Sequence, residues 1–376
     1  MQEIRLLSAI EEARAAGKAA AIATVVRVKG SAYRREGTKM LIDADGKQVC
    51  MISGGCLEQE VGATAQRVME TGEGVVQFFD LEEDLVWGLG LGCGGAVDVY
   101  IEPFDEGEAN AAWLRAVRAG QAAALATVLK IEEGSGLAQA SRMFVSAEGE
   151  PLGTLGNAAL DKQLVGAATE KMSQLYPRSE TKTYELEGGS ADIFLDVTVP
   201  PPELILFGAG HDAIPLAAYA HDLGFSTTVV DARHAFVTAE RFPHAKLVRT
   251  HPSGFAEQVE IGPRSYVVIM NHHLERDKES LAFVLKSGAP YVGALGPRSR
   301  FDDMVSALKE EGRELSSGEV ARVRNPIGLD IGADTPEEIA VSVMAELVAV
   351  RGGYGGGVLS ERRGPIHTDR TSREPL

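Results

Sequence analysis

The chain has 376 residues, 44% of them hydrophobic and 24% charged, which is typical of a globular protein with two or three domains. Its net charge of −17, from 37 Lys and Arg against 54 Asp and Glu, argues against nucleic acid or an anionic membrane as a main partner. Three cysteines are too few for a disulfide framework and no apolar run is long enough for a membrane helix, so a cytoplasmic location is expected.

The N-terminal stretch predicts a mixture of helix and strand. Ile4–Ala16 has the apolar spacing of an amphipathic helix, and the small and β-branched residues of Ala19–Val28 favour a strand. Lys39–Ile42 and Gln48–Ile52 flank Asp45-Gly46, a pair typical of tight turns, and therefore predict a hairpin.

This pattern returns once along the chain. The motif AAIATV at Ala20–Val25 recurs as AALATV at Ala123–Val128, and the same spacing relates Lys39–Ile42 to Arg142–Val145. Self-similarity at a fixed spacing indicates a duplicated folding unit. The sequence therefore predicts an N-terminal α+β region with a degenerate internal repeat.

Three consecutive prolines at 200–202 mark the main domain boundary, because they form a stiff linker. We expect an N-terminal domain over 1–199, with its two copies at about 1–105 and 106–199. A Rossmann-like domain is expected over 200–351. Glycine, arginine and proline dominate 352–376 without apolar periodicity, which predicts a disordered tail.

A nucleotide-binding pattern follows the prolines. The apolar strand Leu204–Phe207 leads into GAGHDA at 208–213, which fits G-x-G-x-x-G/A; Gly208 allows the tight turn and Gly210 lets the backbone approach a phosphate. Asp231 comes after the next predicted strand, where an acidic side chain can bind ribose hydroxyls. The alternative is a Rossmann-type unit whose turn binds nothing.

Further strands at Lys246–Thr250, Ser265–Met270 and Ala289–Val292 alternate with helices and predict an α/β fold with a doubly wound parallel sheet. Ligands of such sheets bind at the carboxyl ends of the strands. His272 lies at that edge, and His211 stands at a helix N-terminus, so both are candidate ligand contacts. For His211, an exposed polar residue without a ligand is the alternative.

Two cysteines lie in glycine-rich loops. Cys56 stands at a predicted helix N-terminus, where the helix dipole favours a thiolate, and the glycines around Cys93 leave room for a large ligand. A thiolate is a nucleophile or a soft metal ligand; the alternative makes both cysteines small buried turn residues. Cys50 is interpreted as a core residue inside a strand. The second copy aligns Asn157 with Cys56 and has no counterpart of the Cys93 loop.

Three charged residues near Cys56 are further candidates. Glu58 falls in the first turn of the predicted helix, where it either complements the helix dipole or acts as an acid–base group. Arg34 lies inside the glycine-bounded loop Gly30–Gly37, next to Arg35 and close to Lys39, and these side chains can bind a phosphate; a solvated loop is the alternative.

Together these motifs resemble the XdhC/CoxI family, the accessory proteins of xanthine dehydrogenase and related molybdenum hydroxylases, from Ala19 to about Gly353. The chain departs from the family at Tyr33, where proline is usual, and at Asn271-His272-His273, which replaces Thr-His-Asp. The motifs that carry the resemblance are Gly30-Ser31, Arg34, Gly37-Thr38-Lys39-Met40, Gly54-Gly55-Cys56-Leu57-Glu58, Gly92-Cys93-Gly94-Gly95, Gly208-Ala209-Gly210-His211, Asp231-Ala232-Arg233, Arg241-Phe242-Pro243 and Gly328-Leu329-Asp330-Ile331-Gly332.

The resemblance implies a chaperone that binds the molybdenum cofactor (molybdopterin) and assists its insertion into an apo-hydroxylase, often with a cofactor sulfurase. On this hypothesis Cys56 and Cys93 contact the molybdenum, and Gly208–His211 hold the terminal phosphate or a nucleotide. A homodimer is expected, because symmetric pairs are the commonest assembly. The remaining candidate cofactor contacts are Glu58, Arg34, Lys39, Asp231 and His272.

Two alternatives from other classes stay open. The same Rossmann unit suits an NAD(P)-dependent oxidoreductase, for which the charge of Asp231 favours NAD over NADP. Against this alternative, the chain shows no separate substrate domain with a convincing acid–base pair. The other alternative is a thiol-dependent sulfur-transfer enzyme that uses Cys93.

Overall fold

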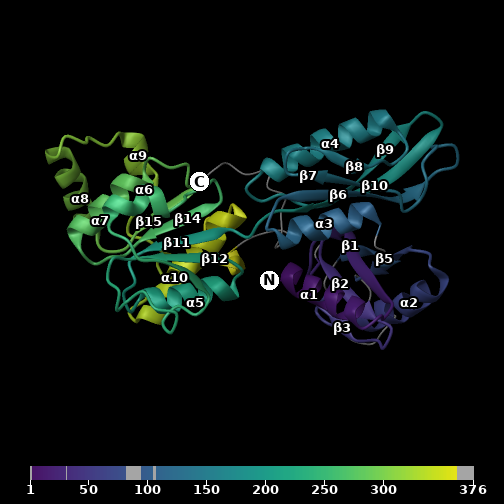
Figure 1. Cartoon of the computed structure of the whole chain (residues 1–376), viewed down its shortest axis with the longest axis horizontal. Helices are drawn as coiled ribbons and strands as arrows, with labels where there is room; N and C mark the ends of the chain where they lie inside the picture. The colour runs from purple at the N-terminus through teal and green to yellow at the C-terminus, as the bar shows by residue number, and fades with distance from the viewer. Residues whose placement is uncertain (1, 31, 82–94, 105–106, 362–376) are drawn as a thin grey trace. The chain divides into compact units, whose positions relative to one another are not determined.

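In the computed structural model the chain divides into two compact units between Pro200 and Pro201 (Figure 1). The structure describes residues 2–30, 32–81, 95–104 and 107–361. Each unit has its own hydrophobic core. No helix formed by these described residues is long and apolar enough to cross a membrane.

The N-terminal unit contains two antiparallel sheets with the same topology. Their strand orders are β3-β2-β1-β5-β4 and β8-β7-β6-β10-β9, so every strand of one sheet has a counterpart in the other. This confirms the internal repeat. The first half contains α1 (Gln2–Ala15), β1 (Ala20–Gly30), β2 (Lys39–Asp43), β3 (Gln48–Val49), α2 (Glu58–Thr71), β4 (Val75–Asp80) and β5 (Gly95–Pro103). The second contains α3 (Glu108–Arg118), β6 (Ala123–Ile131), β7 (Arg142–Ser146), β8 (Pro151–Gly153), α4 (Ala158–Ser173), β9 (Glu180–Leu186) and β10 (Gly189–Thr198).

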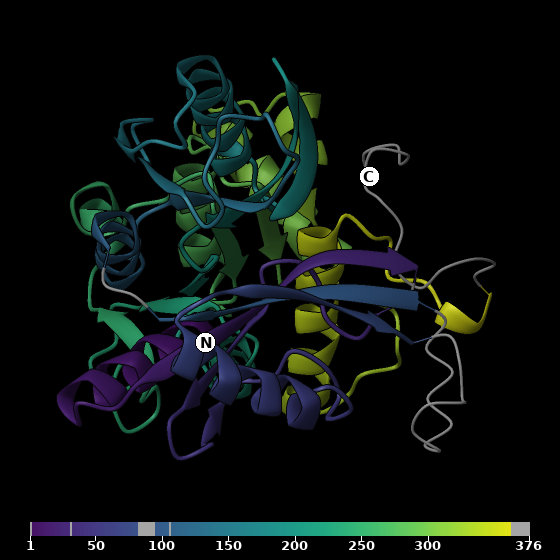
Figure 2. The same cartoon turned by 90° about the vertical axis from the view of Figure 1, so that its right-hand side faces the viewer.

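A helix covers one face of each of these sheets. Val61 of α2 and Leu164 of α4 are fully buried against their sheets. The central strand β1 runs antiparallel beside β5, and the two are the purple and blue arrows side by side in Figure 2. Because successive side chains of a strand point to opposite faces, the residues that do not face the helix lie on the other face of each sheet, where they can pack against the other half.

Among the ion pairs that join the halves, two are the most buried. Lys39 of β2 pairs with Asp196 of β10, and Arg142 of β7 pairs with Glu102 of β5. The strands involved are equivalent in the repeat, so each half offers one base and one acid to the other. All four side chains are less than one-fifth exposed, which strengthens their mutual attraction.

The C-terminal unit is a parallel six-stranded sheet with the order β13-β12-β11-β14-β15-β16. This order is that of a doubly wound Rossmann fold and confirms the predicted fold class. Helix α10 begins with a capping box, in which Thr335 and Glu338 bond each other's backbone N–H groups. The elements are β11 (Glu203–Phe207), α5 (Ala213–Asp222), β12 (Ser226–Val230), β13 (Ala245–Val248), α6 (Phe255–Gln258), β14 (Ser265–Ile269), α7 (Leu274–Val284), β15 (Tyr291–Ala294), α8 (Arg298–Glu310), α9 (Ser317–Ala321), β16 (Val323–Arg324) and α10 (Pro336–Gly352), with short 3-10 turns at Pro252–Gly254 and Leu359–Glu361.

Some local predictions differ from the structure. Strand β3 ends at Val49, and Cys50 follows it half-buried with a φ of 69°, so the interpretation of Cys50 as a core strand residue is wrong. Strand β15 begins at Tyr291, after Pro290, which has no N–H to give to a ladder. Strand β4 was not predicted, because apolar residues occupy both of its faces and hide the alternation.

Candidate functional site

The loop that carries Cys56 is organised around one carboxylate. Glu58 is 8% exposed, and its oxygens accept N–H bonds from Ile52 at 3.2 Å, from Ser53 at 2.8 Å and from Leu57 at 3.2 Å, as well as a bond from the Ser53 hydroxyl. Burial alone would raise the pKa of Glu58, but these bonds bring the pKa below its usual range. Glu58 is thus an ionised anchor of the loop.

Cys56 sits partly exposed just before α2 and is not in a disulfide. The preceding Gly55 has a φ of 110°, and nothing lies within 4 Å of where a β-carbon would stand, so the loop opens to solvent there. Cys50 differs, because burial raises the pKa of its thiol and keeps it protonated. Of the two described cysteines, Cys56 is therefore the better placed for a ligand. Cys93 lies outside the described residues.

The segment of Tyr33 and Arg34 approaches the same loop. The Tyr33 ring is 70% exposed and lies 3.9 Å from the position that a β-carbon would take at Gly54. The Arg34 guanidinium carbon is 5.4 Å from the centroid of that ring. Its Nε is buried and has no hydrogen-bond partner in the part of the chain that the structure describes. Because an unpaired buried donor is costly, this nitrogen is suited to an oxygen acceptor on a ligand.

Lys39, the other candidate phosphate contact, already makes contacts within the N-terminal unit. Its ammonium group pairs with Asp196, donates to the Gly37 carbonyl at 3.1 Å and lies 5.3 Å from the centroid of the Trp113 ring. The structure thus places Tyr33, with Arg34 beside its ring, against the Cys56 loop, and it places Lys39 at the joint between the two halves.

The second half repeats the anchor without the cysteine. Asp161 accepts the Leu155 N–H at 3.0 Å and the Thr154 hydroxyl, as Glu58 does for the equivalent loop of the first half. Aligning Asp161 with Glu58 places Ala159, instead of Asn157, opposite Cys56. Asn157 is the N-cap of α4, where its side chain accepts two backbone N–H groups. The second half therefore keeps the loop geometry and lacks the thiol.

In the C-terminal unit, the glycine turn lies where the strand order changes direction, between β11 and β14. Gly208 has a φ of 123°, and a β-carbon there would stand 2.4 Å from the Met270 carbonyl oxygen. Only glycine fits this approach. A β-carbon added at Gly210 would stand 2.5 Å from Asp212 Oδ1, so the Asp212 side chain would have to move to admit one.

Asp231 braces this turn. It is 3% exposed and accepts the Ala209 N–H at 2.9 Å, while Arg233 bonds both of its oxygens through the backbone and the guanidinium group. Burial would raise the pKa of Asp231, but the bonds to Arg233 and Ala209 lower it. Each oxygen already accepts at least two hydrogen bonds, so Asp231 stabilises the turn and has little capacity left for ribose hydroxyls.

An ion pair that the sequence analysis missed spans the switch point. His272 Nε2 lies 2.6 Å from Asp212 Oδ2, and this bond raises the pKa of His272 although partial burial opposes the shift. His272 has a φ of 56°, unusual for a residue other than glycine, and its ring stays 59% exposed. Asp212 Oδ1 is buried and has no hydrogen-bond partner among the described residues. The sequence feature that could have indicated this pair is Asp212, a carboxylate inside the glycine motif.

The surroundings of this pair are basic. Arg241 donates to the Gly210 carbonyl at 3.1 Å, and Arg276 reaches within 3.8 Å of Asp231. His211 is exposed, with its ring 6.4 Å from that of Phe236. The turn thus presents an imidazole with a raised pKa and guanidinium groups beside backbone N–H groups, which suits a phosphate-bearing ligand.

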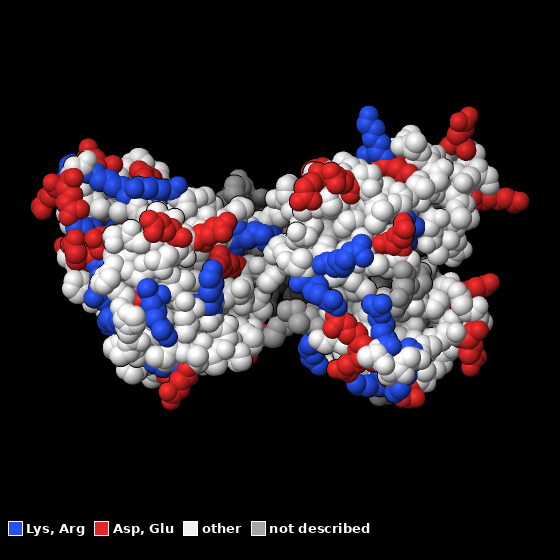
Figure 3. Space-filling view, in the orientation of Figure 1, with Lys and Arg blue, Asp and Glu red and all other residues white. Residues whose placement is uncertain are grey.

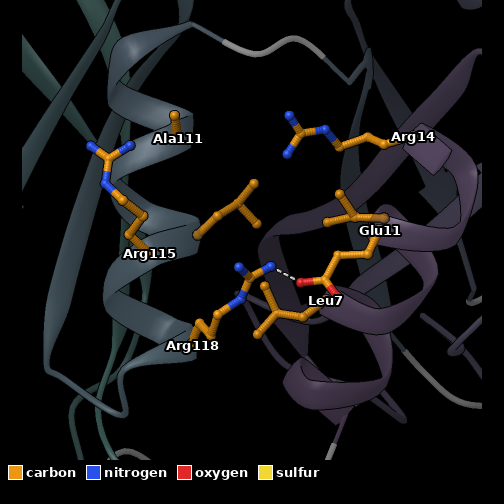
Figure 4. Close-up of a pocket in the computed structure, with 8 residues that line it drawn as sticks. Leu7, Glu11, Arg14, Ala111, Arg115 and Arg118 are labelled. Atoms are coloured by element: carbon orange, nitrogen blue, oxygen red, sulfur yellow. Dashed lines mark ion pairs between the residues drawn. The ribbon is translucent and has the colours of Figure 1, made fainter.

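One further hollow, of about 180 Å³, lies between α1 and α3 (Figure 4). Leu7 and Ala111 line it, and Arg118 pairs with Glu11 across it.

Figure 3 shows acidic and basic side chains interspersed over the visible face. Within the described ranges, no group of three or more His, Cys, Asp or Glu side chains is placed to hold a metal ion.

Comparison with known proteins gives consistent matches over most of the chain. The model of the XdhC and CoxI family matches residues 13–80 and 116–185, one segment in each half of the N-terminal unit, and the model of the XdhC Rossmann domain matches 204–347. The chain is 32% identical to a probable xanthine dehydrogenase subunit of Bacillus subtilis, over 88% of this chain and 93% of that protein.

Two other proteins are similar along nearly their whole length. The molybdenum cofactor insertion chaperone PaoD of Escherichia coli is 23% identical over 90% of this chain and 86% of its own length. A crystal structure described as a xanthine dehydrogenase from Bacillus halodurans superposes with a TM-score of 0.73 at 29% identity, over 96% of this chain and 98% of that one.

Proposed function

The chain belongs to the XdhC and CoxI family, and on that premise we propose that it is an accessory protein that binds the molybdenum cofactor and assists its insertion into xanthine dehydrogenase or a related molybdenum hydroxylase. The cofactor is cargo in this proposal: it is taken up, protected and passed on. The apo-hydroxylase is the principal partner, and a sulfurase is a second one.

The observation that carries the proposal is the juxtaposition at the Cys56 loop. The exposed Tyr33 ring contacts Gly54 of this loop, and the partly exposed Cys56 follows two residues later. Arg34 lies beside that ring, and its buried Nε has no hydrogen-bond partner among the described residues. These groups match the parts of the cofactor: a thiolate suits molybdenum, the Tyr33 ring suits a flat pterin, and Arg34 suits an oxygen acceptor. Glu58 contributes by holding the loop, so its role is positioning.

We propose that the C-terminal unit, taken by itself, binds a phosphate-bearing ligand such as a nucleotide. His272, whose pKa is raised by the hydrogen bond with Asp212, and the N–H groups of the glycine turn supply the donors. We do not extend the proposal to NAD, because Asp231, the acid that would bind its ribose, is saturated by Arg233 and Ala209. A reducing cytoplasm fits this function, since it keeps Cys56 as a free thiol.

The proposal is tested by an insertion assay. The protein is purified anaerobically from cells that make the cofactor and mixed with apo-hydroxylase from cells that do not, and the hydroxylase activity is measured. We expect activity to be restored by the wild-type protein and by Cys50→Ser, but at least tenfold less by Cys56→Ser. Equal restoration by the two serine variants would contradict a role for Cys56, and no restoration by the wild type would contradict insertion itself.

A further inference from the structure

Strand β4 forms one edge of the first sheet and exposes apolar side chains there. Val76 is 37% and Phe78 59% exposed, although both belong to a regular strand paired with β5. They line one wall of a groove of about 460 Å³, whose other wall includes Leu129 and Thr181 of the second half. An exposed apolar edge strand is a template for pairing with another strand.

The backbone of β4 is oriented for such pairing. Leu81 donates its N–H to Gly95 of β5 at 2.8 Å, and in an antiparallel ladder this orientation alternates along the strand. Val76 and Phe78 therefore direct their N–H and C=O groups away from β5. The apolar side chains and the outward backbone groups belong to the same residues.

The internal repeat supplies a comparison within the chain. Val76 and Phe78 lie opposite Tyr100 and Asp98, and the equivalent positions of β9 are Thr181 and Thr183. The hydroxyl groups of both threonines are hydrogen-bonded inside the unit. Thr181 Oγ1 donates to the Val26 carbonyl and Thr183 Oγ1 donates to Asp192, each at 2.6 Å. The second half thus has a polar edge where the first half has an apolar one.

The sequence of β4 is complementary to itself. Val75-Val76-Gln77-Phe78-Phe79 carries valines on one side of Gln77 and phenylalanines on the other. A two-fold axis through Gln77 would set Val76 against Phe78 of a second copy, a favourable aromatic and β-branched pair, with outward N–H and C=O groups facing each other.

The charges agree with this register. The axis sets Asp80 of the second copy opposite Gly74, and Gly74 lines the same groove as Lys130. No acidic residue of the strand is set against its own copy, which matters for two chains that each carry a net charge of −17.

We propose that the chain forms a homodimer by antiparallel pairing of two β4 strands about Gln77, which joins the two first-half sheets into one continuous sheet. The surface is isologous, as a two-fold dimer requires. This assignment is independent of the cofactor proposal, because no residue of the Cys56 loop or of the glycine turn takes part.

Two measurements test the assignment. In sedimentation equilibrium the wild-type protein is expected to be dimeric, and V76T/F78T, which installs the residues of β9, should weaken the dimer at least tenfold in Kd. V341T changes an exposed apolar side chain on α10 and is the control. A monomeric wild type, or a V76T/F78T dimer as tight as the wild-type one, would overturn the proposal.

The second measurement is disulfide trapping. On mild oxidation Gln77→Cys should give a cross-link between the two introduced thiols, identified by peptide mass spectrometry, because the axis brings the two Cα atoms to about 4.5–5.5 Å. Lys182→Cys changes the equivalent position on β9 and should not cross-link. This readout remains valid if V76T/F78T fails to fold. Absence of the cross-link in Gln77→Cys, or an equal cross-link in Lys182→Cys, rules out the β4 register.

Discussion

Two carboxyl side chains illustrate how single residues shape the candidate sites. Glu58 holds the Cys56 loop through backbone N–H groups, and Asp212 holds His272 across the switch point. The sequence identified Cys56, Glu58 and His272, because glycine loops and helix starts are visible in it. It could not reveal that Asp212 pairs with His272, since that contact depends on two strands meeting in space.

Glu58→Gln should lower the free energy of unfolding of the N-terminal unit at pH 7 by about 1–3 kcal/mol, because hydrogen bonds to a buried carboxylate are lost. The folded-state pKa of Glu58 lies below its ordinary 4.5, so the stabilisation is full above that value and lost as the pH falls through the folded pKa. Urea denaturation at pH 7 and in acid measures both effects. A variant with wild-type stability at pH 7 would show that the anchor is dispensable.

Asp212→Asn should lower the pKa of His272, because the carboxylate that stabilises the imidazolium is removed. The folded-state pKa lies above the ordinary 6.5, so this pair stabilises the fold fully below pH 6.5, and its contribution disappears as the pH rises through the folded value. NMR titration of the His272 ring protons measures the shift. Asp222→Asn, an exposed change at the end of α5, is the control and should leave the titration unchanged.

At the scale of elements, strands were predicted best where they are fully apolar or repeated. The Rossmann strands from β11 to β14 and the duplicated β1 and β6 lie close to their expected places. Strand β16 has two residues, too few for a periodic signal, and β4 hides its alternation. Their places at the sheet edges follow from tertiary pairing, which the local sequence does not encode.

Gly208→Ala should destabilise the C-terminal unit by at least about 1–3 kcal/mol, because β11 and β14 must separate to admit a methyl group at a strained φ. Thermal unfolding of the variant measures the loss. Gly288→Ala, where nothing lies within 4 Å of the added carbon, should remain close to the wild type. A similar Tm for the two variants would contradict the close approach at Gly208.

At the scale of the whole molecule, duplication explains the architecture of the N-terminal unit. The halves share a topology and exchange equivalent ion pairs, yet they differ in the Cys56 loop and in the edge strand. One half therefore keeps candidate ligand chemistry, while the other supplies a similar framework with a polar edge.

Lys39→Met should destabilise the N-terminal unit by about 3–5 kcal/mol, because it leaves Asp196 buried without its base. Adding Asp196→Asn should recover part of that loss, so that the double variant is more stable than the sum of the single changes predicts. Denaturant titration of the four proteins gives the coupling energy. A coupling energy of zero would mean that this pair does not join the halves.

The most direct test of the account is the pterin and molybdenum content of protein purified anaerobically from cells that make the cofactor. The account predicts near-stoichiometric pterin in the wild type and in Cys50→Ser, and little in Cys56→Ser. If the wild-type protein carries no pterin, or if Cys56→Ser retains as much as Cys50→Ser, cofactor binding at the Cys56 loop is contradicted.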